Sequence, residues 1–464
     1  MSSRQDQLHS YQFMVQRVVA ALVMRETDPA RSPFRRTAGA TMAGLLIAVI
    51  ALGAVAGYGA ISGGGATGWR DPTVVIVEKE SGARYVYRDG KLHPVLNYAS
   101  ALLIVESARP RTVLVSQSSL EGVRRGVPLG IPGAPDTLPA AERLSGAAWT
   151  VCSAILGGSQ PAARSALLVG AAVERGVALD EEAILAQHPD GSVHLVWQQR
   201  RHRVRDRDLV FTAFGWVGAR PVPVAPALLN VLPAGADLAP VPLVGRGEMS
   251  VKMPGARVGD VFVVRSLSGE RQYLVAKRDG LAGVTPVQAA LLLAVAGQDE
   301  PIDLPQGRFV RLPHLPDLVP DDVAAPPAAP PKLAPVENGT VCGEVRDDGG
   351  VSEVRVGASI PDLADRSATG ARSATGAALA DHIIVEPGRG ALVEAAASPG
   401  ATGGALCVVT DLGRRYPVAD SELLTVLGYG DVQPLRLPAG LVALVPAGPT
   451  LDPTAARAPA LAHG

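Results

Sequence analysis

The sequence predicts an α+β protein with an N-terminal amphipathic helix, one transmembrane helix, and an extracytoplasmic region of four small α+β repeats arranged around a centre. Three observations support this class. A long uncharged apolar segment lies near the N-terminus, and a strand–turn–strand–helix pattern recurs four times after it. The 51 glycines and 39 prolines among 464 residues disfavour a long helical bundle, because both residue types interrupt helices and mark turns.

Residues 1–37 are the expected cytoplasmic segment, and their helix has one apolar face. Apolar side chains recur there at alternating three- and four-residue spacing. They are Leu8, Tyr11, Val15, Val18 and Leu22. A single helix cannot bury such a face by itself, so it needs a partner protein or the membrane surface. Because only Arg17 and Arg25 lie near it, lipid attraction is weak and a protein partner is favoured.

Residues 38–61 carry no charge and are the expected transmembrane helix, since about 20 apolar residues span a bilayer core. Arg31, Arg35 and Arg36 precede the segment, and an excess of arginine keeps its own flank in the cytoplasm. We therefore expect a single-pass protein of the inner membrane. Its N-terminus is cytoplasmic, residues 62–72 form a linker, and residues 73–464 form the extracytoplasmic domain.

A cleaved signal peptide is the alternative interpretation, because Ala54-Val55-Ala56 resembles a cleavage site. All of residues 1–37 would then precede the apolar run, and that run exceeds the roughly 7–15 residues of a signal-peptide core. A retained anchor is the better interpretation.

The region outside the membrane contains four copies of one pattern, near residues 84–104, 193–216, 271–294 and 406–429. Each copy predicts a strand, a tight turn, a short strand and a helix. Asp-Gly pairs such as Asp89-Gly90 tolerate positive φ and favour hairpins. The copies recur at irregular intervals, which excludes a regular solenoid because a solenoid has a fixed period.

Two stretches look like connections between packed units. Residues 313–335 are rich in proline and alanine and should be extended and semi-rigid. Residues 366–377 contain Arg-Ser-Ala-Thr-Gly-Ala twice, which predicts a loop with little to bury.

The order of short motifs along the chain resembles the EccB family of actinobacterial type VII (ESX) secretion systems. The matching stretches are residues 92–97, 99–101, 130–136, 149–152, 279–281, 285–289, Cys342, and residues 410–413, 415–418, 427–430 and 448–453. The resemblance covers essentially the whole chain, including the N-terminal helix and the apolar segment.

The resemblance implies a structural core subunit of a membrane complex. Its partners would be EccC (the cytoplasmic motor ATPase), EccD, EccE and a mycosin-type protease, and the complex would export WXG100-type and related substrates. It also implies an elongated external domain that oligomerises, with four repeats around a β-rich central domain. The repeats are similar in fold to a phage-lysin cell-wall-binding subunit, which adds peptidoglycan as a partner to be tested.

The three cysteines, Cys152, Cys342 and Cys407, leave their pairing open on spacing alone, although an even subset tends to pair in an oxidising compartment. The resemblance implies a Cys152–Cys342 disulfide and leaves Cys407 as a buried free thiol. Closing a loop of roughly 190 residues contributes on the order of 4–5 kcal/mol at most in the chain-entropy model. Three free buried thiols are the alternative.

Motifs for catalysis are missing from the sequence. It contains no G-x-x-x-x-G-K-[ST], H-E-x-x-H or G-x-S-x-G. Residues 63–68 match G-x-G-x-x-G but follow a helix instead of a strand, so a linker is the better interpretation. Four of the eight histidines are candidate metal ligands, and they lack the necessary spacing to one another or to cysteine. They are His93, His194, His202 and His314.

We therefore expect no catalytic residue, no cofactor and no metal. A nucleotide hydrolase remains an alternative because the family has been described as ATPases, and a cell-wall-binding module is a second alternative. The net charge of −1 gives no attraction to nucleic acid. In an arginine run, Arg203, Arg205 and Arg207 alternate along an expected strand and indicate one solvated face, open to an acidic partner or the cell wall. The run also includes Arg200 and Arg201.

Overall fold

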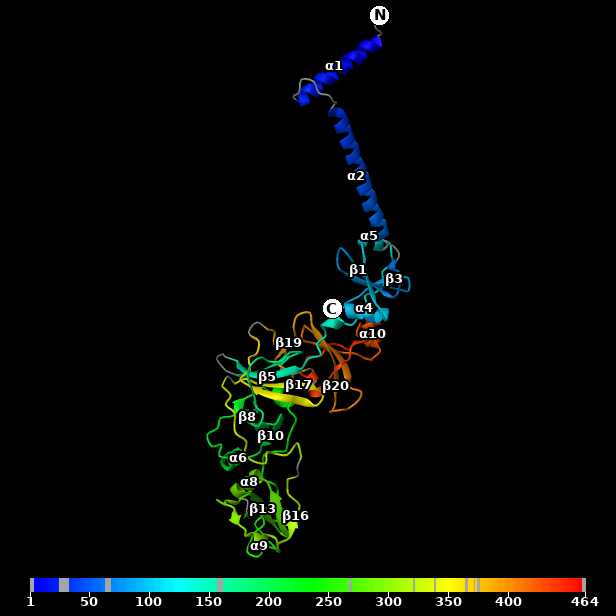
Figure 1. The fold of residues 1–464 in the computed structure, drawn as a ribbon. Coiled ribbons are helices and arrows are strands. Elements are labelled where there is room, and N and C mark those ends of the chain that lie inside the picture. Colours follow the sequence, from blue (N-terminus) through cyan, green and yellow to red (C-terminus); the bar gives the residue numbers. More distant parts are fainter. Residues whose placement is uncertain are drawn as a thin grey trace.

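The computed structural model describes an elongated molecule (Figure 1). The described residues are 4–24, 33–62, 68–156, 162–266, 269–319, 322–337, 339–363, 366–370, 372–373 and 376–460. Two helices, α1 (Arg4–Met24) and α2 (Pro33–Ser62), form one end. Five small sheets follow one another away from them. The mixed α+β class predicted from the sequence is confirmed.

Both N-terminal helices form where the sequence predicts them. Among the described residues, however, no helix is both long enough and apolar enough to cross a membrane. The helix predicted over residues 38–61 is thus present as part of α2, but its role as a membrane span is not confirmed. Trp69 lies within the expected linker, residues 62–72, but it is completely buried in the first sheet unit, where its ring meets Tyr87 edge-on at 5.4 Å between centroids.

Four of the five sheets share one topology. The first strand pairs antiparallel with the second, the second with the third, and a strand after the helix returns parallel to the first. We call these units repeats one to four. Repeat one consists of β1 (Val74–Glu78), β2 (Arg84–Arg88), β3 (Lys91–Pro94), α4 (Tyr98–Val105) and β4 (Arg111–Val115). Repeat two consists of β8 (Ile184–Gln187), β9 (Val193–Trp197), β10 (Arg200–Val204), α6 (Arg207–Ala213) and β11 (Val222–Pro223).

The third and fourth repeats follow the same plan, and in all four repeats a short helix comes after the returning strand. Repeat three consists of β12 (Val261–Arg265), β13 (Arg271–Lys277), β14 (Gly280–Val284), α8 (Pro286–Ala296), β15 (Ile302–Asp303), α9 (Gln306–Phe309) and β16 (His314–Leu315). Repeat four consists of β20 (Gly390–Ala396), β21 (Ala405–Thr410), β22 (Arg415–Pro417), α10 (Leu423–Val426), β23 (Leu435–Pro438) and α11 (Ala439–Val442). The fifth sheet has the order β19-β6-β5-β17-β18-β7 and lies between the repeats. Its strands are β5 (Trp149–Leu156), β6 (Ala162–Leu168), β7 (Val177–Ala178), β17 (Val341–Asp347), β18 (Gly350–Val356) and β19 (His382–Ile384).

The remaining helices are short, namely α5 (Gln117–Leu120), the 3₁₀ turn η1 (Ala141–Arg143), α7 (Pro226–Val231) and α12 (Pro453–Arg457). Local sequence explains several helix starts. Asn97 accepts a hydrogen bond from the Ser100 amide at the start of α4, and Thr285 does the same for Gln288 ahead of Pro286 in α8. These caps satisfy backbone donors that the first helical turn leaves free.

The hairpin turns follow the predicted chemistry in repeat one and depart from it in repeat two. Asp89 and Gly90 both have positive φ, 50° and 71°, as a two-residue hairpin turn requires. Repeat two uses Gln198 and Gln199 at the same place, with φ of 46° and 58°. The left-handed conformation costs residues with a side chain roughly 1–2 kcal/mol, so this turn relies on the strands that it joins.

The repeats pack in the spatial order one, four, central sheet, two, three. Repeats one and four share a core that includes Val86 and Leu103 from the first and Val408 from the last. Arg457 of α12 also forms an ion pair with Glu106 at the end of α4. Repeats two and three meet through α6 and α8. The central sheet packs between repeats two and four, whose equivalent helices α7 and α11 also touch.

A ring on the third strand packs against a glycine in the segment that follows in three of the repeats. The pairs are His93 with Gly126, His202 with Gly235, and Tyr416 with Gly448. A Cβ atom on any of these glycines would overlap the ring. The imidazoles also bond the following backbone, with Nδ1 of His202 lying 2.8 Å from the Ala236 carbonyl oxygen. Glycine is therefore required by close approach, and His93 and His202 are packing residues.

This packing predicts the effect of Gly448→Ala. The added methyl group overlaps the Tyr416 ring, so the free energy of unfolding should fall by about 1–3 kcal/mol, as overpacking generally costs. Urea denaturation of the purified full-length protein measures it. Gly440→Ala in α11 is the control, because nothing lies within 4 Å of its new Cβ. Equal losses in the two variants would contradict the close-approach explanation.

Candidate functional site

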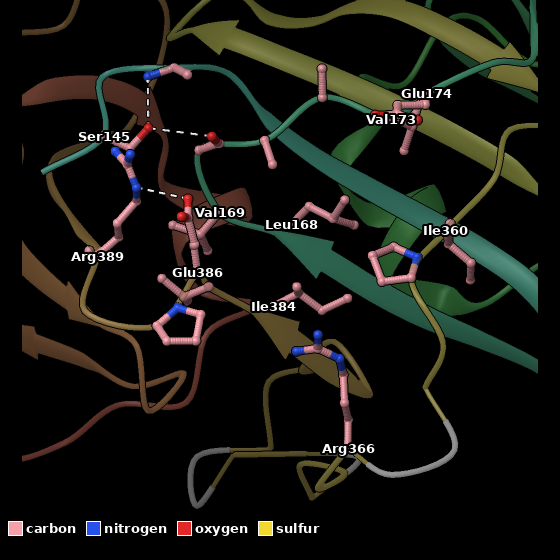
Figure 2. A pocket seen from close by; sticks show the side chains of 18 of the residues that line it. Ser145, Leu168, Val169, Val173, Glu174, Ile360, Arg366, Ile384, Glu386 and Arg389 are labelled. Carbon is pink, nitrogen blue, oxygen red and sulfur yellow. Dashed lines mark hydrogen bonds and ion pairs between the residues drawn. The ribbon is translucent and has the colours of Figure 1, made fainter. Parts of the chain in front are cut away.

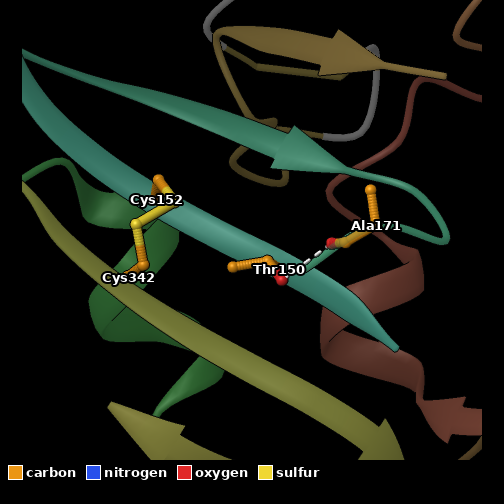
Figure 3. The surroundings of a disulfide bond; sticks show 4 residues. All are labelled: Thr150, Cys152, Ala171 and Cys342. Atoms are coloured by element: carbon orange, nitrogen blue, oxygen red, sulfur yellow. Dashed lines mark hydrogen bonds between the residues drawn. A yellow bond between two sulfur atoms is a disulfide. The ribbon is translucent and has the colours of Figure 1, made fainter. Parts of the chain in front are cut away.

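Cys152 and Cys342 lie directly opposite each other on the antiparallel strands β5 and β17, with their Cα atoms 4.0 Å apart. A disulfide bond joins their sulfur atoms (Figure 3). Both side chains are buried in a small apolar cluster on one face of the central sheet, with Ala358 and Leu363 against them. The disulfide implied by the family resemblance is thus present in the structure.

The disulfide closes the base of an arm that contains repeats two and three. The two cysteines are 190 positions apart, and every strand of these repeats falls between them. The chain leaves the central sheet after β7, builds repeats two and three, and returns to the sheet at β17. The crosslink therefore holds the outgoing and returning chain together where the arm begins.

The returning segment corresponds to the proline-rich connector expected over residues 313–335. Its first residues belong to β16 of repeat three, so the connector begins later than the sequence predicts. Its described part runs beside both repeats. The Val287 amide donates to the Ala328 carbonyl at 3.1 Å, and the Ala334 amide donates to the Ala183 carbonyl at 2.8 Å. The segment is therefore fastened to the arm along its length.

Cys407 lies on β21 and is a buried free thiol. Burial raises the pKa of the Cys407 thiol, and the nearby Arg415 guanidinium opposes that shift. Because the thiolate is the reactive form, this cysteine stays protonated and unreactive.

The five apolar side chains of the predicted α1 face are all exposed, from 43% for Val15 to 74% for Leu22. The others are Leu8, Tyr11 and Val18. Phe13 is also 65% exposed and lies on the opposite side of the helix, a residue that the spacing argument missed. In the described part of the chain, no other element covers this apolar surface.

A cavity of about 790 Å³ opens beside the central sheet (Figure 2). Its walls are mainly apolar and include Leu168, Ile360 and Ile384. Ser145 Oγ donates to the Gly170 carbonyl at 3.4 Å and accepts from the Ala147 amide at 3.3 Å. This hydroxyl therefore holds a turn, and the described residues that line the cavity include no histidine, lysine or cysteine to act as its base.

The charged side chains of the cavity come from two distant parts of the chain. Glu174 belongs to one part, and Arg366, Glu386 and Arg389 belong to the other. Glu386 and Arg389 form an ion pair with 2.8 Å between Oε2 and Nε, and the Arg366 side chain extends toward Ile384 (Figure 2). The cavity thus favours binding of an apolar group over acid–base chemistry. Among the described residues, no three His, Cys, Asp or Glu side chains gather as a metal site would require.

Asp381 fastens the segment before β19 to β6. Its carboxylate accepts hydrogen bonds from the Ser165 amide at 2.8 Å, the Ser165 hydroxyl at 2.7 Å and the Arg164 guanidinium at 3.0 Å. Burial raises the pKa of Asp381, but these hydrogen bonds outweigh it and leave the pKa below its usual range. Thr369, in the expected 366–377 loop, donates its amide to the Asp381 carbonyl at 2.7 Å. That loop is therefore attached to the sheet edge at this point.

Comparisons of the sequence and of the fold with known proteins both point to type VII (ESX) secretion proteins. Residues 1–462 match the family described as type VII secretion system ESX-1, transport TM domain B. The chain is 29% identical to the ESX-3 secretion system ATPase EccB3 of Mycolicibacterium smegmatis, with 96% of this chain and 88% of that protein covered. It is 28% identical to the ESX-5 secretion system ATPase EccB5 of Mycobacterium tuberculosis, with 97% and 92% covered.

Two solved structures are similar over most of their length. A component of an intact ESX-5 inner membrane complex matches with a TM-score of 0.67 and 27% identity, covering 100% of this chain and 96% of that one. A chain of the EccB3 dimer from the ESX-3 core complex matches with a TM-score of 0.64 and 27% identity, covering 83% and 99%.

The disulfide predicts a loss of stability in the Cys152→Ser, Cys342→Ser double variant. The chain-entropy model limits that loss to about 5 kcal/mol, and urea denaturation of the full-length protein without reductant measures it. Cys407→Ala is the control because it removes a thiol and keeps the crosslink. A double variant as stable as the wild type would show that the crosslink does not hold the arm.

The hydrogen bonds to Asp381 predict a pH-dependent effect of Asp381→Ala. Removing a carboxylate with charged hydrogen bonds should lower the free energy of unfolding by about 2 kcal/mol at neutral pH. Because the folded pKa is lowered, this contribution is complete above the unfolded pKa of about 3.9 and disappears as the pH falls through the folded value. Urea denaturation between pH 7 and pH 3 tests this, with the exposed Asp299→Ala as control. A difference that persists unchanged at low pH would contradict the assignment.

Proposed function

Since the chain belongs to the EccB family of type VII secretion proteins, we propose that it is a structural subunit of a type VII secretion membrane complex. One observation carries the proposal: its whole length matches a component of an ESX-5 inner membrane complex with a TM-score of 0.67. The fold agrees with a bracing role. Its repeats are stacked in a row, each packed on its neighbour, and a disulfide closes the base of the arm.

The proposed anchor is α2, inserted once in the inner membrane with the N-terminus in the cytoplasm. Support comes from its large apolar side chains, which are exposed and are not covered by any other described element. They are Met42, Leu45, Leu46, Ile47, Val49, Ile50, Leu52 and Val55. The arginines that precede its apolar segment, Arg31, Arg35 and Arg36, favour the same orientation, and the repeats then lie on the extracytoplasmic side.

The proposed contact on the cytoplasmic side is the exposed apolar face of α1. Its side chains would bury their surface against a partner protein, and EccC, EccD and EccE are the family partners that we propose. A mycosin-type protease and further copies of this chain are the partners that we propose outside. An EccB3 relative forms a dimer, which supports self-association. The complex would export WXG100-type and related substrates.

A nucleotide hydrolase is the second candidate, because several relatives carry the word ATPase in their names. Nothing in the sequence matches a phosphate-binding loop, and we assign no residue to hydrolysis. Full-length protein that hydrolyses ATP faster than a mock purification from the same host would favour this candidate. A cell-wall-binding module is compatible with the structural role, and sedimentation with purified peptidoglycan tests it.

The docking proposal predicts the outcome of a charge substitution on α1. In Val15→Glu, Val18→Glu the two new carboxylates lie on the apolar face, whose burial then costs their desolvation. The variant should lose the other secretion subunits during affinity purification from native membranes in mild detergent, as measured by mass spectrometry of the eluate. The control is Ser10→Glu, Gln16→Glu, which adds the same charge outside that face and should retain them.

Two other results would contradict the proposal. Wild-type protein that elutes alone, or with wall fragments only, would favour an independent wall-binding module. Retention of every subunit by both variants would show that α1 is not the docking element.

A further inference from the structure

A polar hollow of about 340 Å³ lies on repeat two, beside helix α7 and the segment that follows it. Its side chains come from β9, β10 and the tail of the repeat, and they include His194, Arg201, Arg203, Arg205 and Asp237. Unlike the cavity at the central sheet, this hollow has far more polar than apolar lining.

The hollow carries more positive than negative charge. Three arginines line it against two aspartates, Asp190 and Asp237, and both aspartates already have partners. Asp190 accepts from the Ser192 amide at 2.8 Å and lies 2.9 Å from His188 Nδ1, and hydrogen bonds, chiefly from Ser192, hold its pKa well below the usual range. Asp237 pairs with Arg205 at 2.5 Å. Positive charge therefore remains on Arg201 and Arg203.

Comparison with repeat four shows that Arg201 has a structural role and that Arg203 does not share it. Arg201 donates from Nε to the Leu232 carbonyl at 3.1 Å, and Arg415, at the same register of repeat four, donates to the Val445 carbonyl at 2.9 Å. This arginine holds the tail in both repeats. Arg203 has no such counterpart.

The register position of Arg203 is uncharged in the other three repeats. Arg203 lies opposite His194, and the equivalent positions are Pro94, Gly283 and Pro417. The Arg203 side chain is exposed at the hollow, and the structure gives it no acidic partner among the described residues. A guanidinium without a carboxylate in a polar concavity is suited to a planar or tetrahedral oxyanion, which it can bind through two parallel N–H bonds.

His194 forms a buried wall of this hollow, with 6% of its surface exposed. Burial lowers its pKa, and the charges of Arg201 and Arg203 lower it further. The imidazole is therefore neutral at pH 7 and adds no charge, while its Nε2 lies 3.2 Å from the Ser192 hydroxyl. Asn230 on α7 contributes an exposed amide at the rim.

We propose that repeat two binds a small oxyanion, a phosphate ester or a carboxylate group, at the hollow centred on Arg203. Arg203 makes the direct contact. Arg201 adds positive charge while it holds the tail of the repeat, and Arg205 holds the tail through its ion pair with Asp237. The site is independent of the α1 docking face, so it stands even if the proposed cytoplasmic contact is wrong.

Equilibrium dialysis of the full-length protein in detergent with radiolabelled inorganic phosphate, at constant ionic strength in chloride, tests the site. We expect one phosphate per chain at millimolar concentration and at least tenfold weaker binding in Arg203→Ala. Arg271→Ala is the control because Arg271 is an exposed arginine on β13, outside the hollow, and its binding should stay within twofold of wild type.

Competition identifies the source of the anion. Displacement by dimethyl phosphate and not by acetate assigns a phosphate ester, and displacement by acetate assigns a carboxylate. Wild type that binds neither phosphate nor acetate, or Arg203→Ala that binds phosphate as tightly as wild type, would overturn the proposal.

Discussion

The pairing of β5 with β17, crosslinked at Cys152 and Cys342, is the constraint on which the rest of the structure depends. The central sheet is assembled from two parts of the chain that are far apart in sequence, and these strands are where they meet. Once they are joined, repeats two and three can leave as an arm and return. The chain after the sheet then brings repeat four back against repeat one. Loop closure of this length is entropically costly, and a covalent bond at its base removes much of that cost from folding.

The repeats explain why the molecule is a row of units. Each sheet is too small to bury both of its faces alone, so neighbours share cores. Repeat one packs on repeat four, repeat two packs on repeat three, and the central sheet is covered by repeats two and four. The shared topology also makes individual positions comparable. Arg201 and Arg415 hold equivalent tails, whereas Arg203 stands where repeat four has Pro417. A substitution of this kind can give one repeat a binding function that the other repeats of the same fold do not have.

Much of the local structure could be predicted from the sequence. Asp89-Gly90 marks a hairpin, and Thr285 followed by Pro286 marks a helix start. The first strand of each repeat was not predicted, because runs such as Val261–Arg265 are buried on both faces and show no alternation. Two-residue strands such as Val222–Pro223 carry too little pattern to detect. The disulfide came from the family resemblance, since three cysteines alone allow several pairings. The arginine run was interpreted as a solvated face, and three of its side chains do share a hollow. The concavity arises from the tail that folds back beside them, which no local pattern reveals.

The fold requires the two ends of the arm to be joined at one place, and peptide mapping tests this most directly. Full-length protein from its native membrane would be alkylated to block free thiols, digested without reductant and analysed by mass spectrometry. We predict a linked peptide pair that contains Cys152 and Cys342, with Cys407 recovered unlinked. A linked pair that contains Cys407, or Cys152 and Cys342 both recovered as free thiols, would contradict the fold's central constraint.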